Sequence, residues 1–191
     1  ANVTSTARDA VGVLGAGSGS AVTWTNVTVS AALANVTSTA GSGVGVLGAW
    51  SKSGVTWANV TVSAALANVT STAGSYVGVL GAGSYNGTVT WTNVAVTAAL
   101  ANVTSTATGS AVLVLGAGSI SGSVTWTNVA VSAALANVTS TAGSYVGVLG
   151  AGSYSAVTWT NVTVSAALAN VTSTAGSYVG VLGAGSYSAV T

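Results

Sequence analysis

The chain has 191 residues, of which 50% are apolar, 6% aromatic and only 2% charged, whereas an ordinary soluble domain carries about 25% charged residues. Its formal charges are Arg8, Asp9 and Lys52, which give a net charge of +1, and it contains no Cys and no His. This composition excludes a disulfide framework and the clustered cationic surface that nucleic-acid binding requires.

Internal repetition is the strongest pattern in the sequence. The phrase Ala-Asn-Val-Thr-Ser-Thr-Ala recurs with successive starts 33 to 35 residues apart. It begins at Ala1, Ala34, Ala67, Ala101, Ala136 and Ala169. We therefore treat residues 1–191 as a single repeat array, with five complete units and a sixth that is incomplete.

The first element of each unit contains a Thr-x-Thr pair, beginning with Thr4 and Thr6, and a second pair begins with Thr23 and Thr25. Alternate residues of a β-strand share a face, so the two hydroxyl groups of a pair point the same way. Stacked units would then carry rows of Thr, which resemble those of β-solenoid antifreeze proteins. The alternative interpretation is that Thr suits any half-exposed strand.

Two Gly- and Ser-rich segments of each unit are predicted to be turns. The extra residues of the longer units fall there, in residues 85–88, 108–110 and 120–123, as do all three charged residues. Loops tolerate insertion and charge better than packed elements do. The tyrosines lie in the same segments, and we expect them to face solvent: Tyr76, Tyr85, Tyr145, Tyr154, Tyr178 and Tyr187.

Between the turns, the pattern favours β-strands. Residues 11–14 form a short apolar segment with an internal Gly, which is typical of a strand that another segment of backbone approaches closely. Residues 22–25 and 27–30 alternate apolar with hydroxyl side chains on either side of Asn26, as half-buried strands do. Residues 30–34 are Ala-rich and compatible with a helical turn, but too short for an independent helix. We predict two or three strands per unit.

Such strands can be arranged in two ways. In a β-solenoid, each unit of about 33 residues makes one or more coils, and equivalent residues stack about 4.8 Å apart. Stacking favours identical side chains in neighbouring units, whereas an antiparallel sandwich or barrel does not need them. We therefore predict an all-β repeat solenoid, with the antiparallel sandwich or barrel as the alternative.

One Trp keeps the same position in successive units: Trp24, Trp57, Trp91, Trp126 and Trp159. We predict that these side chains stack in the core, because a buried Trp removes a large apolar area from water; a surface platform for sugars is the alternative. Trp50 departs from this position and lies beside Lys52 in a predicted turn, where we expect it to be exposed.

Most Asn residues begin an Asn-x-Thr sequon, and only Asn93 and Asn128 have Ala in place of the Thr. Two interpretations are open: N-glycosylation, or ladders of stacked amides along the axis. Asn86 lies in a predicted turn and is the strongest glycosylation candidate. The others are Asn2, Asn26, Asn35, Asn59, Asn68, Asn102, Asn137, Asn161 and Asn170.

No catalytic, metal-binding or cofactor-binding residue is predicted. General acid–base catalysis needs a group that titrates near the working pH, and the chain has no His or Cys and a single acidic residue, Asp9. A nucleophilic Ser or Thr needs a base, for which Lys52 is the one candidate. We expect that the protein is not an enzyme.

Short segments rich in Val, Thr, Asn, Gly and Ala run through the whole chain. In this they resemble secreted parallel β-helix adhesins of the filamentous haemagglutinin and autotransporter-passenger kind. The resemblance implies an extracellular or cell-surface structural protein, in a filament, sheath or adhesin stalk. We expect self-association or a longer parent chain, and N-linked glycans, but no cofactor, nucleic acid or small-molecule substrate. The alternative functions are an ice-binding solenoid and an outer-membrane β-barrel.

Overall fold

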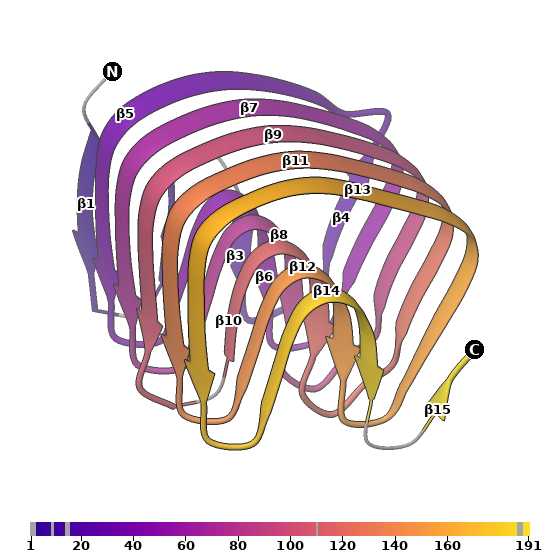
Figure 1. Cartoon of the computed structure of the whole chain (residues 1–191). Coiled ribbons are helices and arrows are strands. Elements are labelled where there is room, and N and C mark those ends of the chain that lie inside the picture. Colours follow the sequence, from indigo (N-terminus) through magenta and orange to yellow (C-terminus); the bar gives the residue numbers. More distant parts are fainter. Residues whose placement is uncertain (1–2, 9, 14–15, 110, 187–188) are drawn as a thin grey trace.

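The computed structural model describes residues 3–8, 10–13, 16–109, 111–186 and 189–191, and every regular element in these ranges is a β-strand (Figure 1). From β5 onward each coil has a long strand followed by a short one. The long strands are β5 (Thr28–Ala40), β7 (Val55–Ala73), β9 (Val89–Ala107), β11 (Val124–Ala142) and β13 (Ala156–Ala175). The short strands are β6 (Gly43–Ser51), β8 (Tyr76–Ser84), β10 (Ala111–Ser119), β12 (Tyr145–Ser153) and β14 (Tyr178–Ser186).

Five shorter strands complete the two ends: β1 (Val3–Ala7), β2 (Ala10–Gly12), β3 (Ala16–Ser18), β4 (Val22–Thr25) and β15 (Ala189–Val190). Within the ranges given above, no helix is present that could cross a membrane.

Long and short strands form two separate parallel sheets. The first has the order β1-β5-β7-β9-β11-β13-β15, with β4 also on β7; the second has the order β14-β12-β10-β8-β6-β2, with β3 also on β6. Equivalent residues of neighbouring units pair directly, as Trp57 does with Trp91 and Leu80 with Leu115. This register confirms the predicted solenoid, with one coil per unit, and the parallel pairing rejects the antiparallel alternative.

In β7, β9, β11 and β13, two Asn residues divide the long strand into three arms, whereas β5 contains only Asn35. In β7 these are Asn59 and Asn68, with φ of 54° and 52°, a left-handed conformation that Asn tolerates better than other residues with a side chain. The strand changes direction at each and resumes its alternation of buried and exposed side chains. Residues 30–34 therefore belong to the continuous strand β5, and the helical turn considered for them is not formed. Pairing with an identical neighbour prevails there over the low strand propensity of Ala.

The short strands form a smaller arch beneath the long one (Figure 1). Four residues of β8 pack in the main core: Val77, Val79, Leu80 and Ala82. Because Val79 and Leu80 are consecutive, the alternation breaks between them, and the strand changes direction there. Gly78 and Gly83 lie on the opposite, concave side, where a Cβ atom would meet the Tyr76 ring. The arch thus encloses a narrow groove.

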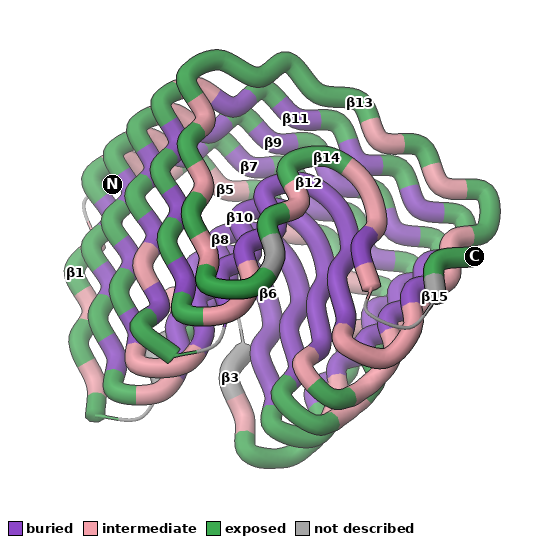
Figure 2. Tube along the Cα trace, turned by 60° about the horizontal axis from the view of Figure 1, so that its bottom comes forward, coloured by how far each residue is buried: buried purple, intermediate pink, exposed green. Residues whose placement is uncertain are grey.

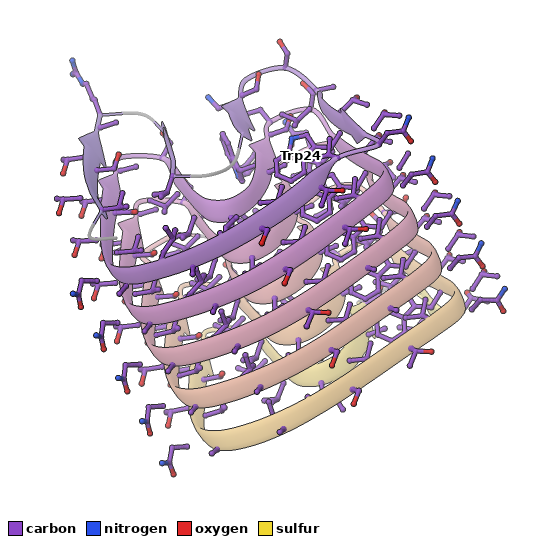
Figure 3. All side chains as sticks on the ribbon, turned by 90° about the horizontal axis from the view of Figure 1, so that it is seen from above. Trp24 is labelled. Atoms are coloured by element: carbon purple, nitrogen blue, oxygen red, sulfur yellow. The ribbon has the colours of Figure 1, made fainter. Side chains whose placement is uncertain are left out.

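The apolar core fills the space between the two arches. Along the long strands of the interior coils, buried residues that face this core alternate with exposed residues on the outer side (Figure 2). Trp57, Trp91 and Trp126 are completely buried. Their rings stack with centroids 4.7 Å apart and planes within 2°. The stack ends at half-buried Trp24 and Trp159, and Trp24, in β4, lies on the inner side of the solenoid (Figure 3). The predicted core position of this Trp column is confirmed.

Two predictions about the turns are wrong. Trp50 belongs to β6 and is only 6% exposed. Tyr76 is the first residue of β8 and is buried, and Tyr145 is half-buried at the start of β12. These side chains fill the groove instead of facing solvent. Tyr85 is exposed as predicted, Tyr154 is half-buried, and Tyr187 and the Tyr178 side chain lie outside the described part of the structure.

Candidate functional site

The Thr-x-Thr pairs form rows on the outer side of the long strands. In β7, Thr70 and Thr72 are exposed, and they pair in register with Thr104 and Thr106 of β9. The same double row includes Thr37, Thr39, Thr139, Thr141, Thr172 and Thr174. The row that begins at Thr23 and Thr25 is less regular, because Ala58 interrupts it.

Two ladders of Asn side chains run along the flanks of the solenoid. In each, the Nδ2 group of one Asn donates a hydrogen bond to Oδ1 of the Asn in the preceding coil, as Asn102 does to Asn68 at 2.9 Å. One ladder joins Asn26, Asn59, Asn93, Asn128 and Asn161. The other joins Asn35, Asn68, Asn102, Asn137 and Asn170.

The ladders explain the Asn pattern without reference to sequons. Asn93 and Asn128 lack the sequon Thr, yet both belong to a ladder and have φ of 53°. At most of the ladder residues with a sequon, the nitrogen that would carry a glycan also donates along the ladder, so a sugar there would have to fit beside the ladder bond. Asn86 belongs to neither ladder and is exposed in a turn, while Asn2 lies outside the described residues. Glycosylation of the ten candidates stays a prediction.

The groove of the short strands was not predicted from the sequence. From the second to the fifth coil, each coil contributes one large side chain to it: Trp50, Tyr76, Leu113 and Tyr145. These side chains come from three different positions of the short strand, because Trp50 is equivalent to Gly83, and Gly43 to Tyr76. Where one position carries a large side chain, the facing position is small.

The contacts in the groove show why only one large side chain fits in each coil. A Cβ atom added at Gly83 would lie 2.2 Å from the Tyr76 ring, and one added at Gly118 would lie 2.6 Å from Leu113 Cδ1. In the second coil, Trp50 instead lies over Gly43, whose added Cβ would be 3.3 Å from the Trp50 ring. The sequence signal for the groove was therefore the exchange of Gly and aromatic residues between two positions seven residues apart.

The hydroxyl of Tyr76 is buried without a hydrogen-bond partner. Burial raises the pKa of this hydroxyl, because the phenolate would lose its hydration, and the nearby Tyr145 raises it further. The phenol therefore stays neutral in the folded protein well beyond the pH at which a free Tyr ionises.

The described coils contain no group of three or more His, Cys, Asp or Glu side chains that could hold a metal ion. Lys52, the one candidate base in the sequence, is exposed in the turn after β6. What the arrangement offers chemically is two kinds of surface: rows of identical side chains along the axis, and a groove lined by aromatic rings.

Comparison with known proteins identifies no relative of this chain. No family model, no curated protein and no solved structure matches the chain.

Proposed function

We propose that the chain is a structural extracellular protein, a β-solenoid segment of a surface filament, sheath or adhesin stalk that associates with copies of itself. The supporting observation is axial continuity. Backbone pairing in two sheets, a Trp stack and two Asn ladders run along one axis through successive coils. Opening an interior coil breaks its contacts with both neighbours at once, so such an array resists local unfolding and proteolysis.

The last described coil supports the association of copies. Leu182 of β14 is 56% exposed, whereas the equivalent Leu149 of β12 is 1% exposed beneath it. Leu168 of β13 is likewise exposed, while Leu135 is buried. The occupant that fits this edge is one more coil with the same face, from a second copy or from a longer parent chain, because every interior coil already covers its neighbour in this way. Unpaired strand edges with apolar residues are templates for such pairing.

Light scattering of the 191-residue chain at micromolar concentration tests this proposal. We expect particles whose mass grows with concentration. Leu182→Lys places a charge on the open edge and should shift the protein to monomers, whereas Thr172→Lys, on the outer side of the same coil, should leave assembly intact. A monodisperse monomer of the unmodified chain at these concentrations would overturn the proposal.

Glycosylation at Asn86 is the second part of the proposal. Its turn is exposed and its amide belongs to neither ladder, so a sugar there would not disturb coil stacking. Intact mass of protein made in a glycosylating eukaryotic host, before and after glycosidase treatment, should show one removable glycan, and Asn86→Gln should remove it. A removable glycan that persists in the Asn86→Gln protein would contradict this assignment.

Ice binding is a second candidate, favoured by the double row that includes Thr70 and Thr72. These side chains are exposed and in register with the pairs of neighbouring coils, which gives a regular array of hydroxyl and methyl groups. Thermal hysteresis of the purified protein measures this activity directly. Thr70→Tyr should abolish most of it, and Thr61→Tyr, exposed on the same strand but outside the row, should preserve it. No hysteresis in the unmodified protein would reject ice binding.

A further inference from the structure

A pocket of about 310 Å³ opens over the second and third coils. It is lined by residues of both rows of turns and by one ring of the groove: Ser42, Trp50, Lys52, Ser75, Tyr85 and Asn86. This volume lies at the lower end of the range of about 300–1,000 Å³ that is usual for small-molecule sites. It is therefore large enough for one or two sugar rings.

Residues that depart from the repeat gather in this pocket. Trp50 stands where the neighbouring coil has Gly83, and Lys52 is the only Lys of the chain. Asn86 lies in the turn that contains the extra residue of its unit, and its backbone N–H bonds to the carbonyl of Lys52 at 3.1 Å. Coil stacking favours identical residues, so stacking gives no reason for this local set of differences.

The chemistry of these residues fits a sugar that carries a negative charge. Tyr85 is 44% exposed, and its ring offers an apolar face with a hydroxyl at its end, while Trp50 forms a mostly buried wall against Tyr76. The Asn86 amide and the hydroxyls of Ser42 and Ser75 provide donors and acceptors for sugar hydroxyls. The described residues include no acidic side chain, so none of them neutralises the ammonium of Lys52.

From this combination we infer that the pocket is a binding site for an acidic sugar, a hexopyranose unit that carries a carboxylate. Tyr85 packs against the ring, the amide and hydroxyls bond its hydroxyl groups, and Lys52 pairs with the carboxylate. A phosphate fits less well, because the pocket has one cation and no helix N-terminus to bind it. The inference does not depend on filament assembly, since the pocket lies on interior coils and not on the open edge.

The pocket also links this inference to Asn86. A glycan on Asn86 would lie at the rim of the same pocket and exclude a free sugar, so the binding site is open only in chains whose Asn86 is unmodified. The binding experiment therefore uses the full 191-residue chain from a bacterial host that does not glycosylate it. The probe is galacturonic acid, and galactose is the uncharged comparison.

Saturation-transfer NMR with both sugars tests the inference. We expect galacturonate to bind in the millimolar range and galactose about 5-fold more weakly, a difference of about 1 kcal/mol. Lys52→Gln should reduce galacturonate binding to the level of galactose and leave galactose unchanged, and Tyr85→Ala should weaken both.

Tyr154→Ala is the matched control, because Tyr154 occupies the same turn position two coils away and does not line this pocket. It should change neither affinity, and circular dichroism of each variant checks that the fold is intact. Absence of transfer to galacturonate, equal binding of the two sugars, or galacturonate binding that survives both Lys52→Gln and Tyr85→Ala would overturn the inference.

Discussion

Asn102 contributes in two ways, through the hydrogen bonds of its side-chain amide and through its left-handed backbone conformation. Its Nδ2 group donates to Asn68, its Oδ1 atom accepts from Asn137 at 3.0 Å, and its φ is 52°. Asn102→Ala removes both hydrogen bonds and places Ala in the left-handed region. We expect a loss of about 2–4 kcal/mol in the free energy of unfolding, measured by denaturant titration.

Asn102→Gly separates the two contributions, because Gly adopts this φ without strain but forms no ladder bonds. It should be about 1–2 kcal/mol more stable than the Ala variant and still less stable than the unmodified protein. Equal stability of the two variants would show that backbone conformation has no part in the effect. A Gly variant as stable as the unmodified protein would show that the ladder contributes nothing.

A column of buried Ser hydroxyls gives a second prediction at this scale. Ser71, Ser105 and Ser140 are almost completely buried, and their Oγ atoms lack hydrogen-bond partners. Ser105→Ala should raise the free energy of unfolding by about 1 kcal/mol, because it removes an unsatisfied polar group. Thr104→Ala, exposed beside it, should change stability by less than about 0.5 kcal/mol. A loss of stability in Ser105→Ala would contradict this explanation.

Side chains that recur at one position were placed correctly from the sequence. The Trp column was predicted to lie in the core, and the ladder was one of two interpretations for Asn, because stacking of identical units brings identical residues together. Trp50 and Tyr76 were misplaced. Each of these side chains is buried because a Gly lies across the groove. Turns and this concave strand face are both rich in Gly and Ser, so composition does not distinguish them.

Among the elements, the short strand offers the sharpest test, because its groove holds one large side chain per coil. Tyr76→Gly should destabilise the protein by about 3 kcal/mol through the lost packing, and Gly83→Trp should destabilise it through a clash with Tyr76. The double substitution reproduces the arrangement of Gly43 and Trp50 in the preceding coil. It should recover stability relative to both single variants.

A double-mutant cycle in denaturant titrations gives the coupling energy of this exchange. We expect coupling of about 2 kcal/mol or more in favour of the double variant, as for residues in direct contact. Additive losses would mean that the two positions do not share the groove, and that Trp50 is buried for another reason.

The sequence was less informative about how far each strand extends. Residues 22–25 and 27–30 were predicted as separate strands around Asn26, which was correct for β4 and β5, but the equivalent residues of later coils form one strand. A left-handed Asn normally suggests a turn, and here pairing with a neighbour of the same shape carries the strand through it. Propensity alone does not contain that cooperative effect.

For the whole molecule, the repeat period predicted the parallel register, but not the shape of the coil. The groove arises because the short strand bends toward the long one, with Val79 and Leu80 both packed in the core. A repeat period fixes which residues become neighbours along the axis. It does not determine the outline of the cross-section, which depends on where each strand changes direction.

Stability of the whole chain against pH follows from its few ionisable groups and from Tyr76. With one acidic residue and no His in the sequence, the free energy of unfolding should be nearly constant between about pH 5 and 9. Above the pKa of 10.0 of an ordinary Tyr, the unfolded chain loses the Tyr76 proton while the folded chain retains it. The contribution of Tyr76 is therefore complete below pH 10.0 and declines above it by about 1.4 kcal/mol per pH unit.

Denaturant titrations from pH 8 upward should show this decline, at a slope of about 1.4 kcal/mol per unit. Tyr76→Phe should remove it, and Tyr85→Phe, at a side chain exposed to solvent, should not. An equal decline in the Tyr76→Phe protein would assign the alkaline instability to groups other than the buried phenol.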